Sequence, residues 1–220
     1  MKESTRLRKE SFILHAAAGV MQKKGLTNFT MEEVAEKANI TKVTLYSYFE
    51  SKENLTMAVC YDVHTKMSHV VKAVIENNTD QNGLESCISI KSAMLHFFLE
   101  NPFRARMMHE FLSIFNMPDN KLSDAMKSSS YRLKLNENSV GLGGMLNAEL
   151  ERGRRDGSIQ SETQGIILFI YVMNCIAGYL TMVSMPGFKD DNTAEFLEEL
   201  TDYHELVART MLTTPVHATV

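Results

Sequence analysis

Two short helical segments joined by a tight turn limit the fold of this chain more than any other feature of its sequence. Thr30 and Glu33 form an S/T-x-x-E capping box, which predicts a helix over residues 31–38. Asn39 follows this helix at a place that requires a left-handed backbone, which Asn tolerates better than other non-glycine residues. A second short helix is expected over residues 42–49. Two short helices joined by such a turn form a helix-turn-helix.

The second short helix has one side suited to packing and another suited to contact with DNA. Thr41 can cap it, and at about 3.6 residues per turn Leu45 and Phe49 share the packing side. The other side carries Val43, Thr44 and Ser47, with Tyr46 and Tyr48 at its flanks. Hydroxyl side chains can contact base edges in the major groove, and tyrosine hydroxyls can reach phosphates. If both tyrosines packed inward instead, more than half of this helix would be buried.

The rest of the sequence also predicts helices. Apolar residues recur at helical spacing nearly everywhere, and the period-two alternation of strands is hard to find. The chain is therefore expected to be all-α, with about nine helices. Outside the helix-turn-helix, helices are expected over residues 5–24, 51–77, 84–99, 102–117, one or two within 121–152, and then 163–185 and 193–212. Residues 153–159 should form a loop, and Ser161 should cap the helix that follows.

Length and charge suggest two domains of different character. A chain of 220 residues suits a small helix-turn-helix module over residues 1–50 and a helical body over residues 51–220. Residues 1–60 contain nine Lys and Arg against seven Asp and Glu, whereas the remainder contains fourteen against twenty. The net charge of −4 therefore conceals a cationic N-terminal part, which suits a DNA-facing module on an acidic body.

Cysteine usage and the one long apolar stretch favour a cytoplasmic protein. The three cysteines are widely spaced and form no CxxC pair, so neither a disulfide framework nor a zinc site is indicated. The apolar stretch over residues 165–185 is long enough to span a membrane. Asn174 interrupts it and its flanks have no basic bias, so we expect a helix buried by its own domain and a partner subunit. An integral membrane protein is the alternative.

Residues 12–55 contain the helix-turn-helix and further residues that fit a known sequence pattern. They are Ile13, Leu14, Ala16, Ala17, Gly25, Thr30, Val34, Ala35, Ala38, Ile40, Thr41, Thr44, Leu45, Tyr46, Tyr48, Phe49, Ser51, Lys52, Glu53 and Leu55. At these positions the chain resembles the TetR/AcrR family of transcriptional regulators, over about a quarter of its length. Asn39 and Val43 depart from the family pattern, which has glycine and a small residue there. Valine should shift base preference toward apolar contact with thymine.

The resemblance implies how the chain would bind DNA. Thr30 and Lys52 would hold the DNA backbone, one from a helix N-terminus and one as a cation. Groove and flanking contacts would come from Lys42, Val43, Thr44, Tyr46, Ser47 and Tyr48. Family members dimerise through their last two helices, which here are residues 163–185 and 193–212. We therefore expect a homodimer on a palindromic double-stranded operator, with its reading helices about 34 Å apart.

The resemblance also implies a small effector that releases the protein from its operator, with repression as the family's commoner mode. The body is rich in methionine and phenylalanine, which suits an adaptable apolar site and a hydrophobic effector. Candidate ligand contacts are His64, Met108, His109, Phe115, Tyr171 and Asn174. A structural role is the alternative for each of them.

Motifs of catalysis are missing from the sequence. It has no nucleophile elbow, Walker loop, HExxH motif or paired carboxylates, and its seven histidines lack metal-ligand spacing. We expect no enzymatic activity, no metal and no cofactor. The main alternative function is a DNA-binding adaptor or architectural protein of the same fold that has no effector. A compound that releases the protein from DNA would distinguish the regulator from the adaptor.

Overall fold

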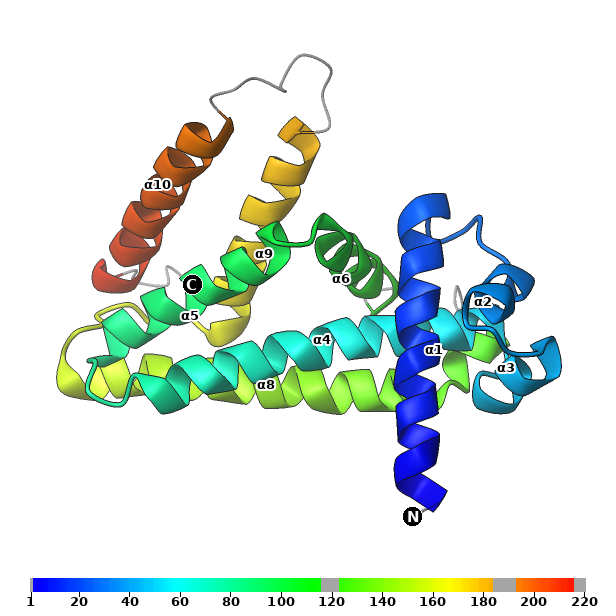
Figure 1. The fold of residues 1–220 in the computed structure, drawn as a ribbon. Helices are drawn as coiled ribbons and strands as arrows, with labels where there is room; N and C mark the ends of the chain where they lie inside the picture. The colour runs from blue at the N-terminus through cyan, green and yellow to red at the C-terminus, as the bar shows by residue number, and fades with distance from the viewer. Residues whose placement is uncertain (1, 116–122, 184–192, 216–220) are drawn as a thin grey trace. The chain divides into compact units, whose positions relative to one another are not determined.

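All the secondary-structure elements of the described chain are α-helices (Figure 1). This computed structural model describes residues 2–115, 123–183 and 193–215. In chain order the helices are α1 (Lys2–Lys24), α2 (Met31–Lys37), α3 (Lys42–Tyr48), α4 (Lys52–Asn77), α5 (Gly83–Leu99), α6 (Pro102–Phe115), α7 (Asp124–Lys127), α8 (Ser130–Asp156), α9 (Gly165–Val183) and α10 (Thr193–Thr213). The all-α prediction is confirmed, with ten helices in these ranges where about nine were expected.

The caps that define the helix-turn-helix form as the sequence predicts. The Thr30 hydroxyl accepts a hydrogen bond from the backbone N–H of Glu33 at 3.3 Å, and the Glu33 carboxylate accepts one from the N–H of Thr30 at 3.0 Å. Asn39 has a φ of +49°, the left-handed conformation expected after α2. The Thr41 hydroxyl accepts from the N–H of Thr44 at 3.1 Å and caps α3. These bonds satisfy backbone donors that each helix leaves open, so they fix where α2 and α3 begin.

Helix α8 corrects the prediction for residues 153–159. It continues to Asp156, so the first part of the expected loop is helical. Gly153 lies inside the helix because of close packing: a Cβ at this position would lie 2.5 Å from Cδ1 of Ile159. The left-handed residue that follows the helix is Gly157, with a φ of +79°. The first glycine of this segment therefore makes room for a neighbour and does not form a turn.

The start of α9 also differs from the prediction. The sequence predicts Ser161 as the cap, but the helix begins at Gly165, whose N–H donates to Oδ1 of Asn147 at 2.7 Å. Ser161 is buried, and its hydroxyl accepts from the N–H of Thr163 at 3.1 Å. A side chain of α8 therefore satisfies the first donor of α9, which no local pattern around residue 161 indicates.

The chain divides into two compact units. The first contains Met1–Thr65 and Glu110–Glu137, and the second contains Lys66–His109 and Asn138–Val220. The first unit thus holds α1, α2, α3 and the beginning of α4, together with the end of α6, α7 and the beginning of α8. Segments far from the helix-turn-helix in sequence therefore belong to the same compact unit as residues 1–50.

In the second unit, α5 packs against α9 and α10. A cluster of buried side chains joins α5, α8, α9 and α10 through Cys87, Leu150, Ile159, Leu168 and Leu212. Arg209 of α10 forms an ion pair with Glu85 of α5 through two hydrogen bonds of 2.6 and 2.8 Å. None of the helices described has both the length and the apolar character that a membrane span requires.

Candidate nucleic-acid interface

Helix α3 has a buried side and an exposed side. Leu45 and Phe49 have no exposed surface, as predicted for the packing side, and burial of each stabilises the unit by about 2 kcal/mol. Val43 keeps 81% of its surface exposed and Tyr46 keeps 41%, and Ser47 is exposed as well. The side predicted to face DNA is therefore accessible in the first unit.

The hydroxyl groups of Thr44 and Ser47 in α3 both make hydrogen bonds near the start of the helix. Ser47 Oγ donates to the carbonyl oxygen of Thr44 at 2.6 Å, and the hydroxyl oxygens of Thr41 and Thr44 lie 2.9 Å apart. A serine hydroxyl has one hydrogen and two lone pairs, so Ser47 in this arrangement can only accept a further bond. The donors in the major groove are the amino groups of adenine and cytosine. This arrangement therefore favours contact of Ser47 with one of those two bases.

Lys42, the first residue of α3, is paired with a carboxylate of α2. Its ammonium group forms an ion pair with Glu32 and lies 5.9 Å from the centre of the Tyr46 ring. The hydrogen bond between them lowers the pKa of Glu32 and raises the pKa of Lys42. Both side chains remain about half exposed, so a DNA phosphate could take the place of the carboxylate.

Lys52 lies against the turn that precedes Thr30, the other residue predicted to hold the DNA backbone. Its ammonium group donates to the carbonyl oxygen of Thr27 at 2.6 Å and lies 4.6 Å from the centre of the Phe29 ring. The Thr30 oxygen accepts a bond from within α2, and its hydroxyl also acts on the Glu33 carboxylate, so a phosphate would compete with Glu33 for the hydroxyl hydrogen. The structure thus brings these two predicted residues to one turn.

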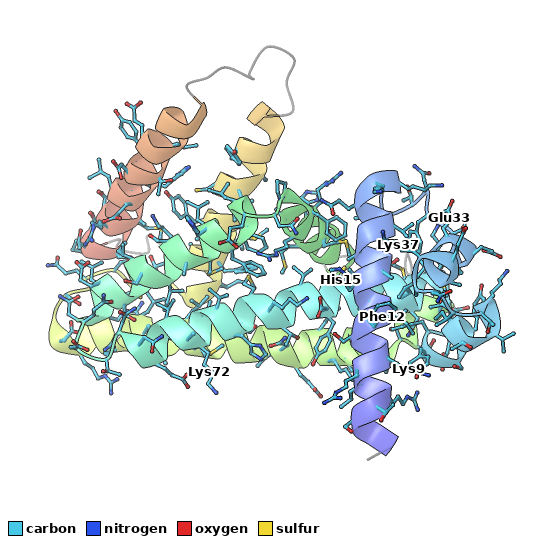
Figure 2. All side chains as sticks on the ribbon, viewed as in Figure 1. Lys9, Phe12, His15, Glu33, Lys37 and Lys72 are labelled. Atoms are coloured by element: carbon cyan, nitrogen blue, oxygen red, sulfur yellow. The ribbon has the colours of Figure 1, made fainter. Side chains whose placement is uncertain are left out.

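Arg6 of α1 is a cation beside α3 that no sequence motif indicated. Its guanidinium group lies 5.7 Å from the centre of the Tyr48 ring, at the opposite end of α3 from Lys42. Among the sequence features, only the excess of cations within residues 1–60 includes this residue. Glu33, in the first turn of α2 (Figure 2), is paired with Lys24 of α1. Cations therefore lie at both ends of α3.

The first unit also ties α3 to the beginning of α8. Tyr131 stacks on Phe49, the residue that ends α3, with ring centres 6.1 Å apart, and its hydroxyl donates to the Glu10 carboxylate of α1. The amide of Asn54 in α4 donates to Oγ of Ser129 at 3.1 Å, and both side chains are buried. A displacement of the beginning of α8 would therefore act directly on the helix-turn-helix.

The residues predicted to contact a ligand are divided between the two units. His64 and Phe115 belong to the first unit and the other four to the second, and the side chain of Phe115 lies outside the described residues. His64 and Met108 are buried, whereas His109 and Asn174 are exposed. Burial lowers the pKa of His64 to about 4, so this imidazole is neutral at pH 7.

Tyr171, the remaining candidate, makes its polar contacts with α10. Its hydroxyl donates to the carbonyl oxygen of His204 at 3.1 Å and lies 3.2 Å from Nδ1 of the same residue. The thiol of Cys175 lies 3.2 Å from that Nδ1, and all three cysteines are free. Within the described ranges, no group of three or more His, Cys, Asp or Glu side chains is placed to hold a metal ion.

Comparison with known proteins gives one consistent family. The family of bacterial regulatory proteins called tetR matches residues 13–59. The chain is 23% identical over 173 residues to a Pseudomonas putida protein described as a probable HTH-type transcriptional regulator, ArpR, covering 77% of this chain and 79% of that one. A tetR-family regulatory protein from Rhodococcus RHA1 has a similar fold, with a TM-score of 0.68, 16% identity, and 93% and 97% of the two chains covered. The regulator FadR from Bacillus subtilis, in complex with stearoyl-CoA, gives a TM-score of 0.65 at 17% identity, with 92% and 98% covered.

Proposed function

We infer that this chain belongs to the tetR family of bacterial regulatory proteins, and we propose that it represses transcription by binding a palindromic operator as a homodimer, from which a small hydrophobic effector releases it. In this proposal residues 1–50 are the DNA-binding domain, and residues 51–220 bind the effector and form the dimer. The protein would act in the cytoplasm, where its operator lies.

The observation that carries the proposal is the division of α3 into an anchored and an accessible side. Leu45 and Phe49 are fully buried, while Val43 and Tyr46 remain exposed at the surface of the first unit. A helix with one side buried in the core and the other side exposed can enter the major groove without any rearrangement of that core. Lys42 supplies a cation at its head for a phosphate beside the groove.

Exposed apolar side chains on α9 and α10 support the homodimer. Each of them keeps at least 44% of its surface exposed in the single chain: Ile166, Ile167, Ile170, Tyr203, Leu206 and Val207. Apolar side chains gathered on two neighbouring elements usually mark an interface. An isologous contact between two copies would cover the same helices in both, and a twofold dimer would match a palindromic operator.

The effector part of the proposal has support from a relative and from the composition of the second unit. FadR, whose fold is similar, was solved in complex with stearoyl-CoA, a ligand with a long apolar chain. Met108 is buried and Tyr171 half-buried in the second unit, so both could line an internal site, whereas exposed His109 and Asn174 could contact a ligand only at the surface. The contacts of Tyr131 and Asn54 would carry a movement of the beginning of α8 to the helix-turn-helix.

The test is selection of bound duplexes from a random DNA pool by the purified full-length protein, followed by titration of the selected duplex. We expect enrichment of a palindrome and a preference of about a thousandfold or more over bulk competitor DNA. The double variant Lys42→Ala/Tyr46→Ala should lose this preference. Lys72→Ala, which removes an exposed cation of α4 (Figure 2), is the matched control and should keep it. Absence of preference for any duplex at low salt would refute DNA-binding regulation.

A screen of hydrophobic compounds for release of the selected duplex then separates the two functions that the sequence leaves open. Release at concentrations near those that saturate binding supports an effector-controlled repressor. If the protein binds its palindrome and no compound releases it, the adaptor without an effector replaces the repressor.

A further inference from the structure

Arg6 of α1 is an exposed cation at the end of α3, and among the described side chains it has no ion-pair partner. Its guanidinium group lies 5.7 Å from the centre of the Tyr48 ring. A cation over a ring contacts the face of the ring, so its N–H donors remain open to an acceptor. An arginine held in this way can still bind a phosphate through two parallel hydrogen bonds.

The carboxylate expected to neutralise Arg6 is that of Glu10, four residues further along α1. Residues four apart are neighbours on the surface of a helix, and opposite charges at this spacing attract each other. Lys72 and Glu76 of α4 form an ion pair of this kind. Arg6 and Glu10 do not, although both side chains line the same cleft of the first unit.

Tyr131 of α8 accounts for the missing ion pair. Its hydroxyl donates a hydrogen bond to the Glu10 carboxylate. Burial and this bond raise the pKa of Tyr131, so the hydroxyl keeps its hydrogen at pH 7. The ring is buried and stacks on Phe49, which fixes the hydroxyl from the core of the first unit. A residue of α8 therefore holds Glu10 away from Arg6.

The cleft that these residues line has a volume of about 440 Å³ and borders α3. Its walls include Arg6, Glu10, Ser47, Tyr48, Tyr131 and Lys134. Ser47 and Tyr48 are also among the residues predicted to contact DNA. The open side of Arg6 is therefore next to the surface that would approach the operator.

Two further charged side chains line the cleft, and their signs are opposite. Glu50 is exposed, two residues after the end of α3, and it forms no ion pair with Arg6 within the described ranges. Lys134 lies over the Tyr131 ring, with its ammonium nitrogen 4.7 Å from the ring centre. Because Glu50 and Lys134 offset each other, the position of Glu10 decides whether Arg6 is available to an anion.

The positions of the cations along α3 suit the two strands of a duplex. Helix α3 has seven residues and is therefore about 10 Å long. The major groove is about 12 Å wide and has a phosphate backbone on each side. Lys42 lies at one end of α3 and Arg6 at the other. The two cations can therefore approach the backbones of opposite strands.

We propose that Arg6 binds a phosphate of the operator backbone, and that α8 controls this contact through the hydrogen bond between Tyr131 and Glu10. While Tyr131 holds Glu10, Arg6 is available to DNA. When the beginning of α8 withdraws, Glu10 is released, pairs with Arg6 and competes with the phosphate. The proposal rests on the function proposed above, to which it adds a DNA contact and a way for the body of the protein to weaken it.

The first experiment tests the DNA contact with the full-length protein and the duplex selected above. Arg6→Ala should weaken binding several-fold and flatten the dependence of log K on log salt by about one unit, measured by fluorescence anisotropy. Arg6 is exposed, so the substitution does not endanger the fold. Arg8→Ala is the matched control: Arg8 is exposed, does not line the cleft, and lies two residues on, nearly opposite Arg6 around α1. It should leave the salt dependence unchanged.

The second experiment tests the control by α8 with a double-mutant cycle. Tyr131→Phe keeps the ring on Phe49 and removes only the hydrogen bond to Glu10, so it should weaken binding by about twofold or more, the size expected of a neighbouring ion pair. This loss should not exceed that of Arg6→Ala, because both changes act on one contact. In a Glu10→Gln background, Tyr131→Phe should cost nothing, since an amide cannot pair with Arg6.

Several results would overturn the proposal. An unchanged salt dependence in Arg6→Ala, or an equal loss in Arg8→Ala, would exclude a specific phosphate contact by Arg6. No loss in Tyr131→Phe, or the same loss with Glu10 and with Gln at position 10, would exclude control through Glu10. In the last case Tyr131 would act through its stack on Phe49 alone, and the melting temperature of Tyr131→Phe would fall by more than loss of one hydrogen bond explains.

Failure of this proposal differs from failure of the proposed function. If the wild-type protein selects a palindrome and Arg6→Ala binds it with the same salt dependence, the repressor stands and the Arg6 contact fails. If the wild-type protein selects no duplex, DNA-binding regulation itself fails, and the Arg6 contact fails with it.

Discussion

Lys42 and Glu32 form an ion pair between the two helices of the helix-turn-helix, so that the cation at the head of α3 is held by a carboxylate in the free protein. DNA binding must replace this carboxylate with phosphate or leave Lys42 unused. Glu32 also adds a negative charge to a surface that would approach the DNA backbone. Both effects oppose binding.

We therefore expect Glu32→Gln to raise affinity for every duplex several-fold and to steepen the dependence of log K on log salt by up to about one unit. Fluorescence anisotropy at a series of salt concentrations measures both quantities. Glu36→Gln removes an equal charge from an exposed position of α2 that makes no ion pair with Lys42. An equal effect of Glu36→Gln would show that overall charge, and not release of Lys42, is responsible.

Val43 offers the most exposed apolar surface of α3. Replacement by alanine removes a contact that valine could make with a thymine methyl group, so Val43→Ala should change the ranking of operator variants that differ at A·T pairs. The free energy of unfolding should stay within about 0.5 kcal/mol, because the side chain packs against nothing that the fold requires. Titration of a panel of operator variants gives the ranking, and an identical ranking in both proteins would contradict the assignment of Val43 to the groove.

Lys52 combines a proposed contact to DNA with an observed contact inside the protein. Lys52→Ala should weaken binding to all sequences and flatten the salt dependence by about one unit. Loss of its bond to Thr27 and of its position over Phe29 should also cost about 1 kcal/mol of stability. Urea unfolding and salt titrations of the same preparation separate the two effects. Lower stability with an unchanged salt dependence would make Lys52 a structural residue only.

Leu206 tests the dimer surface of α10. Leu206→Glu places a charge among exposed apolar side chains that a second copy would bury, so it should shift the protein to monomers and weaken operator binding by at least about tenfold. Leu133→Glu makes the same change at an exposed leucine of α8 in the first unit and should leave the dimer intact. Analytical ultracentrifugation at matched concentrations reads the association. A dimer unaffected by Leu206→Glu would place the interface elsewhere.

The sequence alone was sufficient to predict the helix-turn-helix, because its determinants are local. The capping pair Thr30 and Glu33, the left-handed Asn39 and the cap Thr41 each act within three residues, and all form as expected. The division of α3 into packing and exposed sides follows from helical periodicity alone, and the burial of Leu45 confirms it.

Features set by distant parts of the chain could not be predicted in this way. In the sequence Gly153 resembles a turn residue, but in the structure its lack of a Cβ lets Ile159 pack closely against it. The first backbone donor of α9 is satisfied by Asn147, which belongs to another helix. Lys91 of α5 resembles any other helical lysine in the sequence, because nothing local indicates that it is buried in the second unit. Arg6 lies beside Tyr48 because of how α1 packs, and the sequence pattern does not specify this packing.

His64 should make the stability of the protein depend on pH in mildly acidic solution. Its pKa falls from 6.5 to about 4 on folding because burial opposes the charged form, so the unfolded chain binds more protons between these values. Stability therefore declines as the pH falls from about 6.5 toward 4, by up to about 3 kcal/mol from this residue.

The matched pair of variants is His64→Gln, which removes the buried imidazole, and His109→Gln, which removes an exposed one. Urea unfolding from pH 7 to pH 4 should show a shallower decline in His64→Gln than in the wild type and no change of slope in His109→Gln. Parallel curves for all three proteins would mean that His64 is solvated or already protonated in the folded state.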